Sequence, residues 1–209
     1  KKESISLAII GKPNVGKSSL LNVLLGRQRT IVSDEPGTTR DAIDAKIQFE
    51  GQEYTVIDTA GVRRKSKVDY GVEAFAVVRA LRAIDRADVV ALVIDVNEPV
   101  SNQEQKIATK IDEAGKAAII VLNKWDLIEN RSSGAMNEYI AELKRELKQL
   151  SFADIIFVSA KNKIRTNNLL TAAKNAYEQG GRKIGTALLN QVLNEAVALT
   201  PPPSGKRAK

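Results

Sequence analysis

A glycine- and lysine-rich stretch at residues 11–18 has the spacing G-x-x-x-x-G-K-[ST], which suits a chain of phosphates. Glycines let backbone N–H groups converge on an anion without interference from a Cβ atom. A helix that begins near Gly16 would point its positive end at the same place. In such a cradle Lys17 reaches the β and γ phosphates, and the Ser18 hydroxyl ligates Mg²⁺. The expected phosphate contacts are Gly11, Lys12, Pro13, Asn14, Val15, Gly16, Lys17, Ser18, Ser19 and Gly61.

The stretch Asn123-Lys124-Trp125-Asp126 follows an apolar run and has the side chains needed to choose a purine base. A carboxylate at Asp126 can accept hydrogen bonds from N1–H and N2–H₂ of guanine, whereas adenine would leave it unpaired. Asn123 would shape the loop and meet the purine edge, and Lys124 would pack over the ring. Ser-Ala-Lys at 159–161 offers a backbone N–H to guanine O6. The predicted guanine-binding residues are therefore Asn123, Lys124, Asp126, Ser159, Ala160 and Lys161.

Two further segments contain the residues expected to sense the terminal phosphate. Asp58 would hold Mg²⁺ through water, and the N–H of Gly61 would touch the γ phosphate. Thr39 would reach Mg²⁺ only while the γ phosphate is present, so hydrolysis would release its loop. These segments, taken in order with the two above, resemble the translation-factor-related class of GTPases. The predicted magnesium ligands are Ser18, Thr39 and Asp58, and the predicted catalytic residues are Lys17, Thr39 and Gly61.

Val62 occupies the position at which Ras-like enzymes have a glutamine that orients the attacking water. Valine cannot form that hydrogen bond, so either hydrolysis is very slow or another group assists. The amide oxygen of Asn14 can bind a monovalent cation beside the phosphates; the alternative is that Asn14 only stabilises the turn. Arginines placed to act on the phosphates are Arg40, Arg63 and Arg64.

Short β-branched runs alternate with helical patterns along the chain. Strands are expected at 4–10, 42–49, 54–58, 89–95, 117–123 and 154–158, and helices at 16–25, 71–84, 102–114, 134–150, 167–177 and 186–199. Most strands are apolar throughout, as in parallel sheets covered on both faces. A tight turn at 50–52 predicts one antiparallel edge strand. The predicted fold is α/β, a P-loop NTPase G domain with a doubly wound six-stranded sheet and its sites at the carboxyl ends of the strands.

Composition and charge exclude several kinds of site and catalysis. The 209 residues contain neither cysteine nor histidine, which excludes disulfides, Cys/His zinc sites and thiol or imidazole catalysis. No apolar run approaches the roughly 20 residues of a membrane span. The formal charge of +7 arises from residues 161–209, and this basic end is either a solvated tail or a contact for an anionic polymer. We expect a G domain at 1–179, then a linker and the cut beginning of a second domain at 180–209.

These motifs resemble the Der (EngA) family, bacterial GTPases with two tandem G domains and a KH-like domain. The resemblance rests on residues 11–22, 31–41, 58–73, 86–98, 113–127 and 188–203. It implies the second G domain and the start of the KH-like domain, a monomer in the bacterial cytoplasm without membrane contact, and assembly of the large ribosomal subunit through rRNA. It also implies potassium-stimulated hydrolysis, with K⁺ held by Asn14, Ser33, Glu35 and Thr38. Residues 161–167 depart from the family by being more basic and less glycine-rich.

Alternative functions differ in what the motifs would do. In the main hypothesis the chain hydrolyses GTP as an assembly factor; in the second it is a nucleotide-gated interaction module with negligible hydrolysis, which Val62 favours. A nucleoside kinase would share the phosphate cradle but not the stretch at 123–126. A tRNA-modification GTPase usually carries a C-terminal cysteine, and none occurs here. We expect RNA contact mainly through the missing domain, with the basic tail and residues 63–67 as further candidates.

Overall fold

The computed structural model describes residues 4–27, 44–59, 72–129 and 132–180, without the side chains of residues 72–76. A six-stranded sheet with the order β2-β3-β1-β4-β5-β6 lies at its centre. Neighbouring strands are parallel except for β2 and β3, so the predicted fold class is confirmed. The strands are β1 (Ser4–Ile10), β2 (Ala45–Phe49), β3 (Gln52–Ile57), β4 (Val89–Asp95), β5 (Ala117–Asn123) and β6 (Asp154–Phe157).

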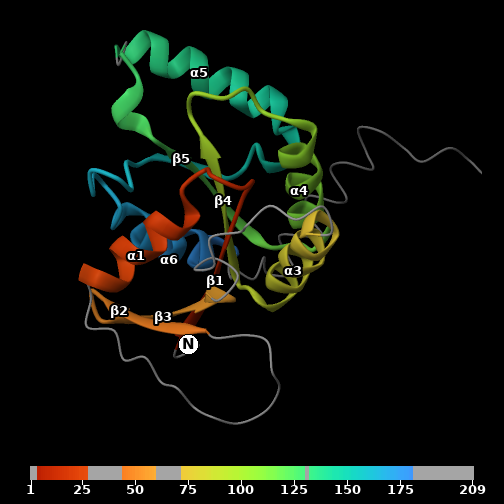
Figure 1. Cartoon of the computed structure of the whole chain (residues 1–209), viewed down its shortest axis with the longest axis vertical. Coiled ribbons are helices and arrows are strands. Elements are labelled where there is room, and N and C mark those ends of the chain that lie inside the picture. Colours follow the sequence, from red (N-terminus) through yellow and green to blue (C-terminus); the bar gives the residue numbers. More distant parts are fainter. Residues whose placement is uncertain (1–3, 28–43, 60–71, 130–131, 181–209) are drawn as a thin grey trace, which may run out of the picture.

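Helices cover both faces of this sheet (Figure 1). Side chains of α1 and α6 pack on one face, and those of α3, α4 and α5 pack on the other. The helices are α1 (Lys17–Arg27), α3 (Val72–Arg86), α4 (Asn102–Glu113), α5 (Ser133–Glu146) and α6 (Asn168–Gly180), with short 3-10 helices η1 (Trp125–Leu127) and η2 (Lys148–Leu150). Among the described helices, none is long and apolar enough to cross a membrane.

The strands β4 and β5 are apolar at every position but the last because each face of the sheet meets its own helical layer. Along β4, Val89, Ala91 and Val93 pack toward α1 and α6. The intervening Val90, Leu92 and Ile94 pack toward α3, α4 and α5. A sheet buried in this way presents its polar loops only at the strand ends, and the loops that follow β1, β4, β5 and β6 form the candidate site.

The predicted hairpin between β2 and β3 is present, with boundaries that differ from the expected ones. Phe49 pairs with Gln52 across a two-residue turn, and both turn residues have positive φ, 47° at Glu50 and 75° at Gly51. This is the geometry that matches the twist of paired antiparallel strands. The first strand begins at Ala45 rather than at 42, and the second ends at Ile57 because Asp58 turns away with φ 54°.

The predicted continuous helix at 134–150 is wrong at its end. The helix α5 stops at Glu146 because Leu147 has φ −111° and ψ 49°, outside the helical region. The break and the following η2 bring Leu147 and Leu150 into full burial beneath the sheet. The helix expected at 186–199 lies outside the described residues.

Candidate functional site

The phosphate loop leads from β1 into α1 and packs directly against two neighbouring strand ends. A Cβ atom on Gly16, whose φ is +99°, would lie 2.1 Å from Nδ2 of Asn123. A Cβ atom on Gly11 would lie 2.3 Å from the carbonyl oxygen of Val93. Both approaches are too close for any side chain, so the two glycines are what allow the loop to pass under β4 and β5.

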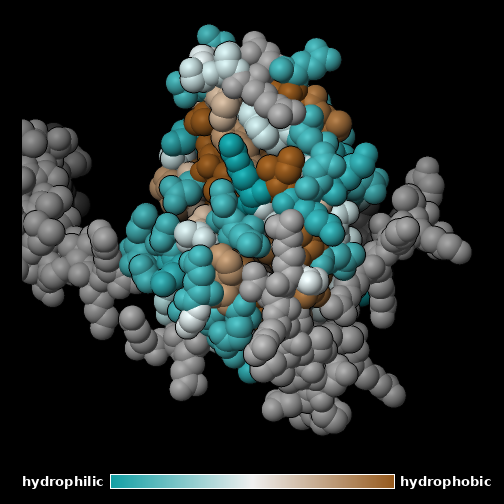
Figure 2. All heavy atoms as spheres, turned by 90° about the vertical axis from the view of Figure 1, so that its left-hand side faces the viewer, coloured by the Kyte–Doolittle hydropathy of each residue, from teal (hydrophilic) through white to brown (hydrophobic). Residues whose placement is uncertain are grey.

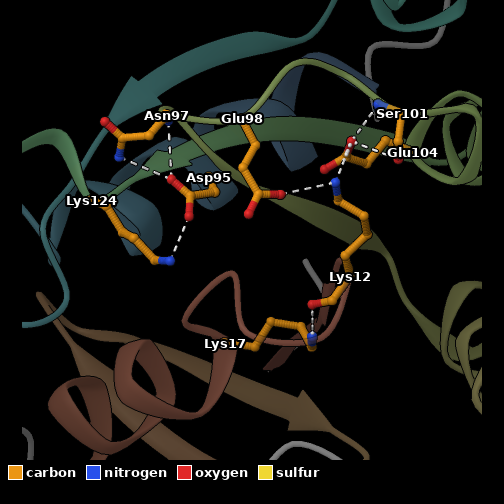
Figure 3. Close-up of polar contacts among 8 residues, drawn as sticks. All are labelled: Lys12, Lys17, Asp95, Asn97, Glu98, Ser101, Glu104 and Lys124. Atoms are coloured by element: carbon orange, nitrogen blue, oxygen red, sulfur yellow. Dashed lines mark hydrogen bonds and ion pairs between the residues drawn. The ribbon is translucent and has the colours of Figure 1, made fainter. Parts of the chain in front are cut away.

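Lys17 lies in the first turn of α1 with its ammonium turned back toward the loop. Its Nζ donates a hydrogen bond to the carbonyl oxygen of Lys12 at 2.5 Å (Figure 3). Burial lowers the pKa of Lys17 to about 8. Burial removes water that would stabilise the ammonium. An anionic ligand nearby would therefore stabilise the charged form strongly, because it compensates for this lost solvation.

Lys12 is held by two carboxylates, one in the β4–α4 loop and one in the first turn of α4 (Figure 3). Its Nζ lies 3.2 Å from Oε2 of Glu98 and 3.4 Å from Oε2 of Glu104. Burial lowers the pKa of Lys12, but the bonds to Glu98 and Glu104 outweigh it and the pKa is raised. Glu104 is only 1% exposed and also accepts hydrogen bonds from the N–H and Oγ of Ser101, at 2.8 and 3.0 Å. The carboxylate of Glu104 therefore joins the start of α4 to the phosphate loop.

Asn123, the last residue of β5, connects three segments of the site. Its Nδ2 donates to the carbonyl oxygen of Val15 at 2.8 Å, and its Oδ1 accepts from the N–H of Ala160 at 3.0 Å. The side chain is buried, with an exposed fraction of 2%. The phosphate loop, the loop after β5 and the loop after β6 therefore share one amide group.

Lys124 is aimed across the site by an unusual backbone conformation. Its φ is 64°, in the left-handed region, and its Nζ forms an ion pair with Oδ2 of Asp95 (Figure 3). Burial alone would raise the pKa of Asp95. The bonds from Lys124 and from the N–H and side chain of Asn97, both 3.0 Å, hold the pKa below its usual value. A charged Asp95 thus fixes the lysine that follows Asn123.

A cavity of about 200 Å³ lies between the phosphate loop and the loops after β5 and β6. It is lined by Asn14, Gly16, Ser19, Asn123, Lys124, Asp126, Leu127, Ala160 and Lys161. Apart from Leu127, all of these residues are expected from the sequence to bind phosphate or guanine. Ser159 lies beneath, 1% exposed, with its Oγ accepting from the N–H of Asn162 at 3.2 Å. The residues from three distant parts of the chain thus meet at one hollow.

The expected magnesium ligands are placed only in part. Ser18 lies in the first turn of α1, and Asp58 follows β3, with its N–H donating to Oδ1 of Asp44 at 3.0 Å. Hydroxyl and carboxylate oxygens are donors that suit Mg²⁺. The remaining expected ligands and catalytic groups lie outside the described residues, namely Ser33, Glu35, Thr38, Thr39 and Gly61, together with Val62, Arg40, Arg63 and Arg64.

Sequence reasoning missed the residues that support the site from β4 and α4. Asp95 forms an ion pair with Lys124, and Glu98 and Glu104 form ion pairs with Lys12, yet none of the three acids was expected to do so. One signal was available, since Ser101 and Glu104 have the spacing of a helix-capping box, which indicates a buried and well-positioned glutamate. Leu127 was missed as well. It follows Asp126 directly and is 58% exposed at the edge of the cavity.

A family model described as "50S ribosome-binding GTPase" matches residues 6–124. GTPase Der of Synechococcus sp. (strain JA-3-3Ab) is 48% identical over 207 residues, which cover 99% of this chain and 45% of the relative. GTPase Der of Fusobacterium nucleatum subsp. nucleatum is 51% identical over 205 residues, covering 98% and 47%. The chain thus spans about half the length of these relatives.

Solved structures show the same architecture. Era in complex with MgGDPNP and nucleotides 1506–1542 of 16S ribosomal RNA has a TM-score of 0.62 at 28% identity, covering 83% of this chain and 57% of that one. The elongation factor SelB of Methanococcus maripaludis, in complex with GppNHp, has a TM-score of 0.58 at 22% identity, covering 82% and 34%. The second likeness is one of fold alone.

Proposed function

The chain belongs to the family of 50S ribosome-binding GTPases, and from this premise we propose that it binds GTP and GDP and hydrolyses GTP. The observation that carries the proposal is the shared cavity. Asp126 of the loop after β5, here called the base loop, lines the same cavity as Asn14 and Gly16 of the phosphate loop and Ser19 of α1. A nucleotide spans a base and a phosphate chain, and this arrangement provides for both ends.

Base selection would fall to the carboxylate of Asp126. It accepts from N1–H and N2–H₂ of guanine, whereas adenine offers no donor at position 1 and would leave the carboxylate unpaired. Lys124 is held by Asp95 beside the cavity, which supports a role for its stem in covering the purine ring. Asn123 supports both loops through its bonds to Val15 and Ala160.

Phosphate binding would exchange the contacts of Lys17. Its ammonium leaves the carbonyl oxygen of Lys12 and meets the β and γ phosphates, where the charge is stabilised rather than penalised by burial. Backbone N–H groups of the loop and the N-terminal end of α1 add partial positive charge. Mg²⁺, held by Ser18, Thr39 and Asp58 when present, neutralises charge on the phosphates. Contacts of Gly61 with the γ phosphate and of Thr39 with Mg²⁺ would make the conformation of their loops depend on the γ phosphate.

Catalysis without a glutamine calls for another group near the γ phosphate. Asn14 lines the cavity with its backbone in the left-handed region at φ 65°. We assign it to a K⁺ site, with Ser33, Glu35 and Thr38 as the other ligands. A cation there would take the role of an arginine on the transition-state charge. The alternative function is a nucleotide-gated interaction module with negligible hydrolysis. It follows if no other group takes the role of the glutamine that Val62 replaces.

The biological setting is proposed from the relatives. The chain would be the second G domain of a Der-like protein, residues 1–179, followed at 180–209 by a linker and the first part of a KH-like domain. The full-length protein would act on the large ribosomal subunit and its rRNA in the bacterial cytoplasm, and the 209-residue chain would be a monomer. Matches to GTPase Der along nearly the whole chain support this setting.

Turnover of GTP in matched potassium and sodium buffers tests the proposal. We expect potassium-stimulated turnover that Asn14→Ala abolishes while GDP binding is retained. Asn137→Ala is the matched control, because Asn137 is exposed on α5 away from the cavity. Tight GDP binding with near-zero turnover in both salts would instead favour the interaction module.

A further inference from the structure

The basic loop at residues 161–165, here called the 161–165 loop, has no role in the nucleotide site beyond Lys161. We propose that this loop, with the adjoining exposed row of α6, binds the phosphodiester backbone of ribosomal RNA. The inference rests on the proposed function, because it names a surface of the G domain itself that meets the ribosome.

The loop is closed on itself by hydrogen bonds. Ser159 and Ile164 form an antiparallel bridge with two backbone hydrogen bonds, of 3.1 and 2.9 Å. The N–H of Asn162 donates to Oγ of the buried Ser159 at 3.2 Å. All five residues between Ala160 and Thr166 are exposed, three of them cationic. Charges displayed on a preformed turn lose little conformational freedom on binding, so they suit recognition of a repeating anion.

Two of the cations have a backbone conformation that favours glycine. Lys163 has φ 57° and Arg165 has φ 54°, both in the left-handed region. That region is unfavourable for a side chain with a Cβ atom, a cost that glycine does not carry. Strain of this kind is typical of functional positions. A long basic side chain at each of two strained positions indicates that the charges are used.

The chain from the end of β6 through most of α6 has cations and no acids, between Asp154 and Glu178. Residues 155–177 contain no aspartate or glutamate and four cations, Lys161, Lys163, Arg165 and Lys174. The N–H of Asn168 donates to the carbonyl oxygen of Arg165 at 3.1 Å, which joins the loop to α6. A local excess of cations attracts a polyanion.

Neutral hydrogen-bonding groups continue the surface along α6. Asn168, Thr171 and Asn175 recur at helical spacing, are exposed, and line an open groove of about 420 Å³ against the edge strand β6. Amide and hydroxyl groups contact phosphate and ribose oxygens in nucleic-acid complexes. The acid in this groove is Asp154, at the start of β6.

RNA fits these groups better than the other anionic partners. Ile164 is the apolar residue exposed on the loop, and no aromatic residue occurs in it, so the loop offers phosphate contacts rather than base stacking. A lipid surface is bound by cations beside an apolar face that enters the headgroup layer. The exposed residues that α6 contributes to the groove are instead amides and a hydroxyl, and the apolar lining residues Ile155, Ile156 and Ala172 are buried or half-buried. The family description, 50S ribosome-binding GTPase, supports a ribosomal source for the RNA.

The test compares Lys163→Gly/Arg165→Gly with the unaltered 209-residue chain, using protein-free large-subunit rRNA as the probe. We expect RNA affinity to fall about tenfold and the slope of log affinity against log salt to decrease by about 2, one per lost cation. The melting temperature should stay the same or rise, because glycine relieves the left-handed strain. A structural role would lower stability instead. Lys163→Asn/Arg165→Asn, which tolerates this conformation and keeps side chains, should reproduce the RNA defect.

The matched control is Lys106→Ala/Lys110→Ala on α4, which removes the same charge from the opposite side of the sheet. It should keep most of the RNA affinity. Equal losses in both double variants, or none in the loop variants, would overturn the proposal. So would loss of binding to phosphatidylglycerol vesicles with rRNA binding intact, which would assign the loop to a lipid surface. GDP binding should be unchanged throughout, and its absence from the unaltered chain would contradict the proposed function instead.

Discussion

Asn123 and Val15, 108 residues apart in the chain, are joined by a hydrogen bond of 2.8 Å from Nδ2 to the carbonyl oxygen. The bond fixes the middle of the phosphate loop to the end of β5. Because Oδ1 of the same amide accepts from the N–H of Ala160, one side chain joins the loops that are proposed to bind the phosphates and the base. The amide of asparagine supplies both the donor and the acceptor that these two bonds need.

Asn123→Ala should weaken GDP binding at least about tenfold and lower the free energy of unfolding by about 1–3 kcal/mol. The substitution leaves the carbonyl of Val15 and the N–H of Ala160 without this buried partner. Calorimetric titration with GDP and urea unfolding measure the two effects. Asn137→Ala, on the exposed surface of α5, is the control and should change neither. An affinity unchanged by Asn123→Ala would show that the amide does not position the site.

Gly16→Ala should abolish nucleotide binding, because its Cβ atom would lie 2.1 Å from Nδ2 of Asn123 at a backbone φ of +99°. The matched substitution is Gly26→Ala within α1, where a Cβ atom meets no atom within 4 Å. Replacing a helical glycine by alanine stabilises by roughly 0.5–1 kcal/mol. Melting temperature and GDP binding should therefore separate the two variants. Retained GDP binding in Gly16→Ala would contradict the close packing of the loop.

Lys17→Met should stabilise the ligand-free chain near neutral pH while it removes nucleotide binding. Burial lowers the pKa of Lys17 from 10.5 to about 8, so the unfolded chain binds more protons between these values. Stability of the unaltered chain should consequently rise as pH increases through that window. GDP affinity should fall there, because the ammonium loses its proton.

Urea unfolding across this pH window measures the first effect, and Lys17→Met supplies the baseline, since it lacks the titrating group. Parallel pH profiles for the two proteins would show that Lys17 is not the buried cation described.

Lys12→Met and Glu104→Gln should interact energetically, because Lys12 Nζ lies 3.4 Å from a carboxylate that is 1% exposed. A double-mutant cycle in urea should give a coupling of about 0.5–3 kcal/mol. Lys12→Arg should retain GDP affinity better than Lys12→Met. The exposed pair Lys110–Glu113 is the control and should couple by less than about 1 kcal/mol. Equal coupling in both pairs would remove the case for a special tie between α4 and the phosphate loop.

Most of the fold could be predicted from the sequence because its signals are local and redundant. Continuous apolar runs indicate strands covered on both faces, and the short turn at 50–52 identifies the antiparallel edge. The end of α5 could not be predicted, because the pattern continues through Leu147 and only packing of Leu147 and Leu150 beneath the sheet breaks the helix. The helical spacing of apolar residues does not show where tertiary contacts end a helix.

The candidate site divides in the same way. Motif spacing predicts Gly16, Lys17, Asn123 and Asp126. At each of these positions the proposed chemistry requires one particular side chain or, at Gly16, the absence of a side chain. The partners of Lys12 and Lys124 could not be assigned, because Glu98, Glu104 and Asp95 lie some 30 to 90 residues away along the chain and meet the lysines only through strand order. Acidic residues after a strand are common, and sequence spacing alone does not pair them.

The most direct test of the central claim measures binding of GDP, ADP and xanthosine diphosphate to the unaltered chain and to Asp126→Asn. We expect the unaltered chain to bind GDP and to reject ADP by at least about a hundredfold, because adenine leaves the carboxylate unpaired. Asp126→Asn should lose GDP and gain xanthosine diphosphate, whose O2 accepts from the new amide. Equal affinity for GDP and ADP, or no effect of Asp126→Asn on either, would contradict a guanine site at this cavity.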